Sequence, residues 1–239
     1  MKILNVLNMK KLVFPFLVMV MLGWTGCMKP GDNIQDFQYV VAFVEFDFEL
    51  GLFQNVLKTA SGTMASNEIQ RADLYDGDAL LAFFTVNFDQ QVSDNYTLVY
   101  DFNYIKCSRG VAEATPGGAS VAGDFDLPIG AIDIFGGLDN SLFFGFRHKD
   151  ISDKDNFIYE MTYDVNEPVV YLRAKKNATG SKNTVCAFNM YRFFSDHKNA
   201  DNKVTFTIKY KTGVKDNGED DYETFVFENG SPQITVEIH

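Results

Sequence analysis

The feature that most constrains this chain is a period-two alternation of apolar and polar residues, which recurs from about residue 37 to the end. Between Tyr96 and Tyr104 every even position carries Tyr, Leu or Phe. Successive side chains of a strand point to opposite faces, so this alternation predicts strands that each cover a core with one face. No segment shows a sustained helical period, and at most a short helix is expected around residues 56–60 or 69–75. We therefore expect an all-β protein.

Two details of the first half refine this prediction. Apolar side chains occupy odd positions from Phe37 to Phe43 and even positions from Val44 to Leu50, and such a change of phase predicts a bulge or bend. The turn signal Asp76-Gly77-Asp78 precedes Ala79–Phe88, a run that is apolar on both faces. That run predicts a central strand.

The chain divides in two at residues 109–120. This stretch contains Pro116, Gly117 and Gly118 and few bulky residues, which is typical of a linker or a long loop. Residues 37–110 hold about five long strands and suit a small OB-like barrel. Residues 120–239 hold about eight short strands, with turns at 177–180 and 216–219, and suit an antiparallel β-sandwich.

The N-terminus has the pattern of a signal peptide. Lys2, Lys10 and Lys11 precede thirteen uncharged residues, Leu12–Trp24. As a helix these would span roughly 20 Å, too short for a ~30 Å bilayer core, so residues 1–26 are predicted to be a signal peptide. Met9 precedes the two adjacent lysines, and either Met1 or Met9 is the start of the natural chain.

The signal peptide ends in Thr25-Gly26-Cys27, which resembles the lipobox of bacterial lipoproteins. The resemblance implies cleavage before Cys27 and a diacylglycerol on its sulfur, with residues 27–36 as a lipidated tether. The alternative is an ordinary secretory signal with an incidental Cys27. A lipid anchor would place the protein at the outer membrane, facing either the periplasm or the cell surface.

A wider resemblance rests on the lipobox, on the segment Gly77–Val86, on the long strand at 96–106 and on Asn202–Tyr210. Together they resemble the NigD-like lipoproteins of Bacteroidetes. The resemblance implies an OB-like domain followed by a β-sandwich. It implies no catalytic signature, cofactor or ligand.

Charge and cysteine usage exclude several classes. The formal net charge is -11, and removal of the three lysines with residues 1–26 leaves 18 basic residues against 32 acidic ones, or -14. Such a chain is a poor partner for nucleic acid, whose phosphates require Lys and Arg. Cys107 and Cys186 lack a CxxC neighbour, which disfavours a metal or redox site. They either form a disulfide or pack as small core residues.

Signatures of catalysis are weak. His148, His197 and His239 form no HExxH motif, and Ser195-Asp196-His197 is adjacent in sequence, whereas a triad is assembled in space. We expect that segment to be a strand running into a polar turn. The remaining candidates are a glycosidase pair among Glu160, Asp164, Asp124 and Asp126, a calcium turn at Asp216–Asp221, and a basic spot of Arg173, Lys175, Lys176 and Lys182. A solvated surface explains each of them as well, and we predict no enzyme, metal or cofactor.

The sequence therefore predicts a non-catalytic cell-envelope lipoprotein that is attached to the membrane through Cys27 and binds an envelope protein or a glycan. One alternative is a carbohydrate-binding accessory of a glycan-uptake system, which exposed coplanar aromatic residues would favour. Another is a fimbrial or structural subunit, which an unpaired terminal strand at 233–238 would favour.

Overall fold

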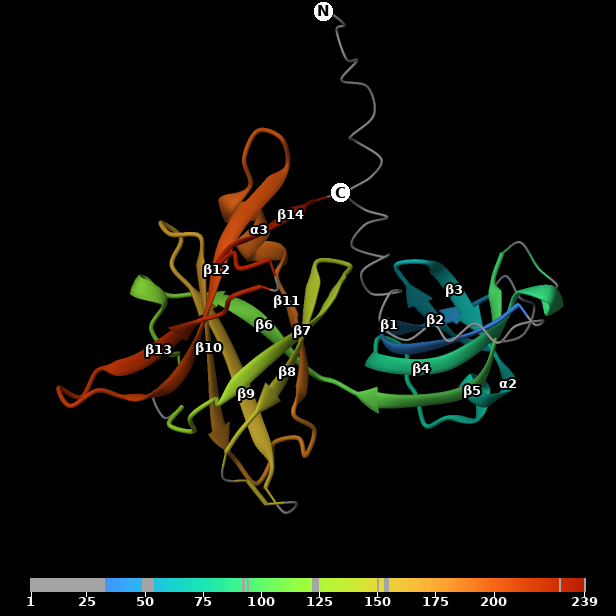
Figure 1. Cartoon of the computed structure of the whole chain (residues 1–239), viewed down its shortest axis with the longest axis horizontal. Coiled ribbons are helices and arrows are strands. Elements are labelled where there is room, and N and C mark those ends of the chain that lie inside the picture. Colours follow the sequence, from blue (N-terminus) through green and yellow to red (C-terminus); the bar gives the residue numbers. More distant parts are fainter. Residues whose placement is uncertain are drawn as a thin grey trace, which may run out of the picture.

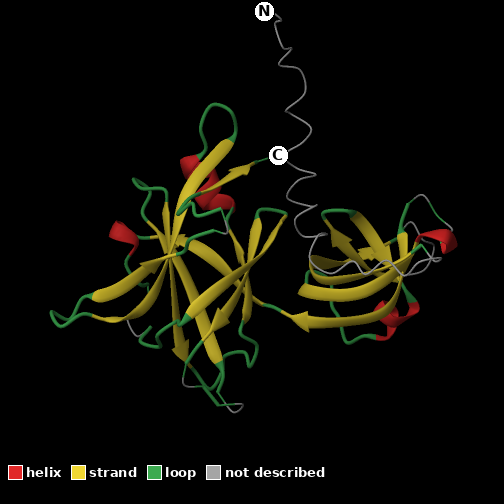
Figure 2. Cartoon of the chain, viewed as in Figure 1, coloured by secondary structure: helices red, strands yellow, loops and turns green. Residues whose placement is uncertain are grey.

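The computed structural model describes residues 33–48, 54–91, 93, 95–121, 125–149, 151–152, 155–227 and 229–238. The predicted signal peptide and Cys27 lie outside these residues. Most of the described chain is strand (Figure 2). In chain order, the elements are β1 (Ile34–Asp47), β2 (Gln54–Thr59), β3 (Gly62–Ala65), α2 (Asn67–Arg71), β4 (Ala79–Asn87), η1 (Phe88–Gln90), β5 (Thr97–Lys106), β6 (Ser108–Ala114), η2 (Pro116–Gly118), β7 (Ala131–Leu138), β8 (Ser141–Arg147), β9 (Phe157–Tyr163), β10 (Val169–Lys176), β11 (Val185–Asn189), α3 (Tyr191–His197), β12 (Lys203–Val214), β13 (Asp220–Thr224) and β14 (Ile234–Glu237). None of the helices in this part of the chain is long and apolar enough to cross a bilayer.

The first five strands close into a barrel in the order β1-β2-β3-β5-β4, which lies at the right of Figure 1. The pairing of β3 with β5 is parallel and the others are antiparallel. The short helix α2 follows β3, and the Ser66 hydroxyl caps it by accepting from the Ile69 amide. Closure leaves the barrel without a free edge. The predicted OB-like barrel is confirmed.

The predicted bulge in β1 exists, but it lies earlier in the strand. The register with β4 shifts between Phe37 and Val40, and Tyr39 has a φ of 56°. After this bulge the even residues Val40, Ala42 and Val44 face the barrel core. Val41 and Phe43 are buried on the other face, so the apparent change of phase near Val44 reflects burial on both sides.

The remaining strands form a curled sheet in the order β13-β12-β10-β9-β6-β11-β8-β7, with β14 also paired to β12. Its inner face encloses a large core that includes Phe144, Met161, Phe188, Phe193 and Phe206. The predicted second all-β unit is therefore confirmed. Its pairing is mixed, because β6 runs parallel to both β9 and β11, and β10 runs parallel to β12.

The expectation of a linker or long loop over residues 109–120 is wrong for residues 109–114 and holds for residues 115–120. Residues 108–114 form β6 in the middle of the sheet, and the chain leaves the barrel at Cys107. Within β6, the small residue Gly110 is needed for close packing. A Cβ at Gly110 would lie 2.5 Å from the Phe188 ring, so glycine makes room for that ring between neighbouring strands.

Two further expectations change near the C-terminus. Residues 191–197, expected to begin as a strand, form α3, whose Phe193 and Phe194 are buried in the sandwich core. The terminal strand β14 is paired, since Ile234–Glu237 lies antiparallel to Phe206–Lys203 of β12. Ile234 and Val236 also pack against the core.

Candidate functional site

The barrel and the sandwich meet at an apolar junction that the sequence did not single out. Phe43 of β1 packs against Phe143 of β8, with ring centroids 5.6 Å apart. A buried cluster spans both units and consists of Val41, Phe43, Ala79, Leu81, Cys107, Phe143, Val185 and Ala187. The sequence does contain a signal for this junction, since Val41–Val44 and Ala79–Ala82 are uninterrupted apolar runs. Such runs are the pattern of strands that are covered on both faces, as these are.

Polar contacts fix the same junction. Lys58 of β2 forms ion pairs with Asp139, in the β7–β8 turn, at 3.1 Å and with Glu45 at 3.3 Å. The hydrogen bond to Asp139 is the main reason that the pKa of Lys58 is raised. A second polar contact also joins the two units: Arg109 of β6 donates to the carbonyl of Gly77, which precedes β4, at 2.8 Å. The two units are therefore held by both apolar burial and directed hydrogen bonds.

Three aromatic residues, Tyr39, Phe83 and Phe135, line the rim of this junction; we call them the rim aromatics. The ring of Tyr39 lies edge-on to Phe83 at 4.9 Å and is stacked on Phe135 at 5.4 Å with an interplanar angle of 12°. Tyr39 and Phe83 come from the barrel and Phe135 from β7. The Tyr39 side chain remains 47% exposed. The rim aromatics are thus an apolar surface that both units build.

A network of charged side chains lies on the outer face of β9, β10, β12 and β13. Arg173 is 3% exposed, and its guanidinium donates to Thr162 Oγ1 at 2.7 Å, the Gly118 carbonyl at 2.6 Å and Glu160 Oε1 at 3.3 Å. Glu160 in turn accepts from the Val121 amide at 2.9 Å. The predicted exposed basic spot is therefore wrong for Arg173, which is a buried residue that binds the segment after β6 to the sheet.

The network continues on β12 and β13. Lys211 donates to the Phe125 carbonyl at 2.8 Å and pairs with Asp220 at 2.6 Å. Tyr222 accepts from Arg173 Nε at 2.5 Å and donates to Asp220 at 3.0 Å. Burial raises the pKa of the Tyr222 phenol, which keeps it a neutral hydroxyl able to do both. Burial also disfavours ionisation of Asp220, but its bonds to Lys211 and Tyr222 outweigh this and lower the pKa of that carboxyl.

Two other members of the basic spot have structural partners. Lys176 pairs with Asp155 at 2.8 Å, and the Lys175 ammonium lies 4.6 Å from the centre of the Phe125 ring. Arg173, Lys175 and Lys176 therefore each contact a different neighbour. The expectation that they form a solvated hairpin face holds only in part.

The carboxylates considered for glycoside hydrolysis also have structural partners. Glu160 is bound to Arg173 and a backbone amide, as described above. Asp164 accepts from the amides of Asn166 and Gly117, which lowers the pKa of its carboxyl. A general acid requires a raised pKa, so Asp164 is unsuited to that role. Asp126 is exposed, and Asp124 lies outside the described residues.

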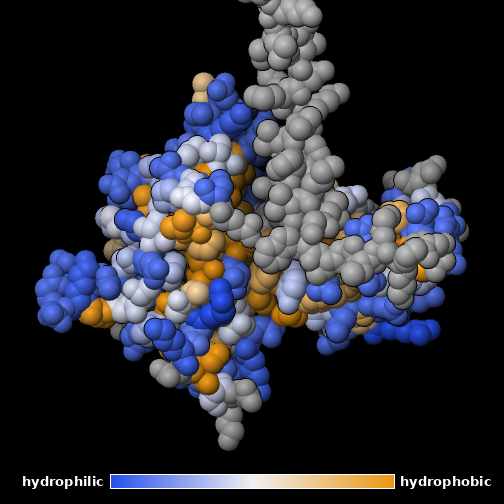
Figure 3. Space-filling model, viewed as in Figure 1, coloured by the Kyte–Doolittle hydropathy of each residue, from blue (hydrophilic) through white to orange (hydrophobic). Residues whose placement is uncertain are grey.

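The acidic turn at Asp216–Asp221 projects from the sheet between β12 and β13, where Figure 3 shows a strongly hydrophilic tip. Its Asn217 side chain accepts from the Glu219 amide, and the Asp220 carboxylate forms an ion pair with Lys211. In the described part of the chain, no group of three His, Cys, Asp or Glu residues is placed to hold a metal ion.

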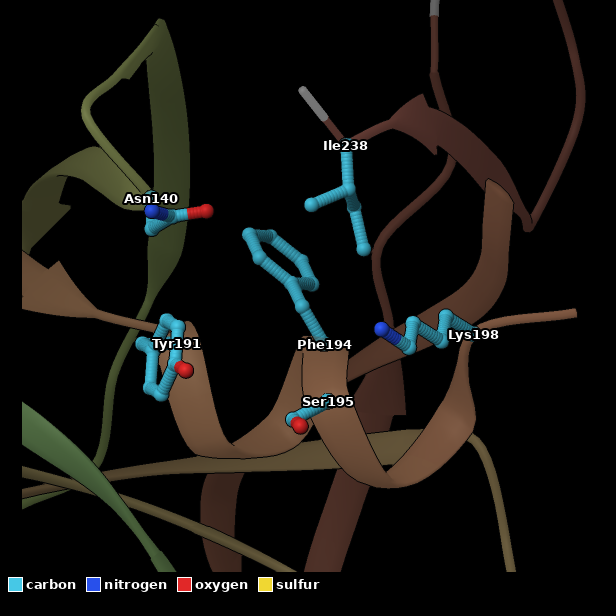
Figure 4. Close-up of a pocket in the computed structure, with 6 residues that line it drawn as sticks. All are labelled: Asn140, Tyr191, Phe194, Ser195, Lys198 and Ile238. Carbon is cyan, nitrogen blue, oxygen red and sulfur yellow. The ribbon is translucent and has the colours of Figure 1, made fainter. Parts of the chain in front are cut away.

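The residues Ser195, Asp196 and His197 do not converge. Asp196 accepts from the Tyr163 hydroxyl at 2.6 Å, and His197 packs edge-on against Tyr163 and beside Phe193. Ser195 instead lines a small hollow of about 60 Å³ together with Asn140, Tyr191, Phe194, Lys198 and Ile238. Figure 4 shows Phe194 and Ile238 side by side in this hollow. Ligand pockets usually hold roughly 300–1,000 Å³, so the hollow is too small to be one.

Both cysteines of the described chain are free and buried. Cys107 belongs to the junction cluster, whereas Cys186 belongs to the sandwich core on the other face of the sheet. Burial raises the pKa of the Cys107 thiol to about 12 and raises that of Cys186 as well. Of the two alternatives for these residues, this structure therefore shows core packing.

No protein-family model matches the chain, and no curated protein matches it. Among solved structures, an uncharacterized protein from Parabacteroides merdae is similar, with 15% sequence identity and a TM-score of 0.62. The match covers 84% of this chain and 98% of that one. The two proteins share one fold. Because the sequences are so different, the likeness does not extend to function.

Two further solved structures match this chain more loosely. A NigD-like immunity protein from Bacteroides caccae aligns over 87% of this chain and 99% of its own, at 10% identity and a TM-score of 0.40. A candidate lipoprotein from Bacteroides fragilis aligns over 80% of this chain and 96% of its own, at 12% identity and a TM-score of 0.48. A NigD-like protein is thus among the similar structures, as the sequence resemblance predicted. These TM-scores are too low to support an inference about function.

Proposed function

We propose that this chain is a non-catalytic lipoprotein of a Gram-negative cell envelope, anchored through Cys27, whose folded part binds an envelope protein or a glycan. The observation that carries the proposal is the N-terminal pattern: a basic start, thirteen uncharged residues and Thr25-Gly26-Cys27. The apolar run is too short to cross a bilayer and ends at a lipobox-like cysteine. Two acyl chains on that cysteine would anchor the protein stably.

The side chains of the folded part support the non-catalytic half of the proposal. The candidates for general acid or nucleophile are bound in structural contacts: Glu160 to Arg173, Asp196 to Tyr163, and Asp164 to two amides. An active site requires titratable groups that converge on a pocket, and these residues face separate neighbours. The rim aromatics at the junction offer a surface for binding instead.

The structure also bears on the fimbrial alternative. A subunit that accepts a strand from a partner leaves part of its own sheet unpaired. Here the C-terminal strand β14 is paired with β12, and its apolar residues lie against the core. The feature that would have favoured this alternative is therefore not found at residues 234–237.

The test is a comparison of the wild-type chain with Cys27→Ser in the native host. We expect wild-type protein to incorporate an alkyne-tagged fatty acid and to sediment with membranes, and Cys27→Ser to lose both properties. Cys107→Ser is the matched control, because it removes a thiol outside the lipobox and should keep the label. If Cys27→Ser remained labelled and membrane-bound, the proposal would be wrong.

Protease treatment of intact cells then distinguishes the two locations. Digestion of the wild-type protein in intact cells would place it on the cell surface. Protection until the outer membrane is opened would place it on the periplasmic face. The Cys27→Ser variant serves here as the soluble reference.

A further inference from the structure

Three backbone irregularities meet at the rim aromatics, one on each strand that contributes to them. In β1 the register shifts between Phe37 and Val40, around Tyr39. The pairing of β4 with β5 shifts directly after Phe83, and that of β7 with β8 shifts around Phe135. A β-bulge re-aims a side chain and interrupts pairing, and bulges concentrate near functional sites. Each rim aromatic thus lies at a bulge.

Tyr39 is held in a conformation that a tyrosine rarely adopts. Its φ of 56° lies in the left-handed region, which favours Gly and Asn and is strained for a bulky residue. Deep burial does not offset this strain, since Tyr39 is 47% exposed. A strained and exposed aromatic residue is better explained by a contact with a partner than by packing alone.

The surroundings of the rim aromatics supply hydrogen-bonding groups. The Phe135 ring lies over Gly145, where a Cβ would meet it at 2.9 Å and would lie 3.7 Å from the Asp133 Cβ. Asp133 pairs with Arg147 at 3.1 Å, and their side chains are 47% and 67% exposed. The Phe135 ring, on which Tyr39 is stacked, therefore lies close to an exposed carboxylate and guanidinium whose charges balance.

Resting on the proposed function, we propose that the rim aromatics bind a neutral polysaccharide, with a sugar ring against Tyr39 and its hydroxyls bonded to Asp133 and Arg147. The C–H groups on one face of a sugar ring suit the negative face of an aromatic ring. Carboxylate and guanidinium groups accept from and donate to neighbouring hydroxyls.

Size and charge select this partner. Tyr39 exposes roughly 100 Å², taking a whole tyrosine as about 150–250 Å². That area is what one sugar ring covers, and it is a small part of the about 800 Å² that a protein partner usually covers. The net charge, -11 for the whole chain and -14 without residues 1–26, disfavours an anionic polysaccharide, while a neutral one meets no repulsion.

The experiment is affinity electrophoresis of the full chain in non-ionic detergent through native gels that contain laminarin, xylan, mannan or dextran. Polygalacturonate and chondroitin sulfate are the anionic comparisons. We expect at least one neutral polysaccharide to retard the wild-type protein, and Tyr39→Asn to weaken that retardation about tenfold. Asn tolerates a positive φ, so this variant removes the ring without adding strain.

Three further variants make the result specific. Tyr39→Phe keeps the ring and should bind like the wild type. Tyr75→Asn removes another exposed tyrosine of the barrel and should also leave binding unchanged. Phe135→Leu should weaken binding in the same direction as Tyr39→Asn, and it provides a second test if Tyr39→Asn does not fold.

The proposal is overturned if none of the four neutral polysaccharides retards the protein, or if Tyr39→Asn and Phe135→Leu bind as the wild type does. Retardation by the anionic polysaccharides alone would also overturn it. If retardation fails while attachment through Cys27 persists, the lipoprotein proposal stands with a protein partner. If attachment through Cys27 fails, the lipoprotein proposal is wrong whatever the gels show.

Discussion

Replacing Arg173 by Met tests whether the buried network holds the segment after β6 against the sheet. The Met side chain preserves most of the apolar volume and removes the guanidinium. Glu160 would then keep only the Val121 amide, and the Gly118 carbonyl would lose a charged donor. Breaking a buried ion pair by removing one partner costs about 3–5 kcal/mol. This is a large share of the ~5–15 kcal/mol that stabilises a typical domain.

The assay is urea unfolding followed by circular dichroism, with the midpoint and slope fitted for each variant. A loss of about 3–5 kcal/mol corresponds to a fall in melting temperature of roughly 6–20 °C for a chain of this size. Arg147→Met is the matched control, because the same substitution there removes an exposed ion pair with Asp133, worth at most about 1 kcal/mol.

A double variant separates the loss of the pair from the penalty of an unpaired charge. Arg173→Met combined with Glu160→Gln removes the carboxylate that Arg173→Met leaves without its guanidinium. We expect this double variant to recover part of the lost stability, since the two residues share one network. If Arg173→Met lost no more than Arg147→Met, the network would not be what holds residues 116–121 in place.

Three other predictions follow from single contacts. Gly110→Ala places a Cβ 2.5 Å from the Phe188 ring and should cost about 1–3 kcal/mol in urea unfolding, whereas Gly213→Ala, which meets nothing within 4 Å, should cost less than half as much. Burial lowers the pKa of His148 below its ordinary 6.5, so the unfolded chain binds more protons as the pH falls through 6.5. The unfolding free energy should therefore decrease from pH 7 towards pH 5.5, and His148→Gln should flatten this dependence. The Cys107 thiol, whose pKa burial raises to about 12, should resist iodoacetamide at pH 8 until urea is added; rapid labelling of the native protein would contradict its position in the junction cluster.

The sequence alone determined the fold class, because period-two alternation leaves few options besides strands. It also located individual strands: the central strand predicted over Ala79–Phe88 is β4, and the long strand predicted at 96–106 is β5. The turns at 177–180 and 216–219 were also identified from the sequence, because the backbone preferences of turn residues act over only a few residues. The lipobox-like pattern is local in the same sense, because a processing signal is read as a linear pattern, and it stays a prediction.

Other features depend on contacts between residues far apart in the chain, and only the tertiary structure decided them. Gly110 is typical of a loop in isolation, yet it is in a central strand because the Phe188 ring occupies the space that a side chain would take. Arg173 is buried because Pro116–Gly118 packs against β9 and β10, where the Gly118 carbonyl accepts from its guanidinium. The rim aromatics come from β1, β4 and β7 and meet only when the barrel docks on the sandwich. Alternation gives the face on which a side chain lies, but the fold decides what covers that face.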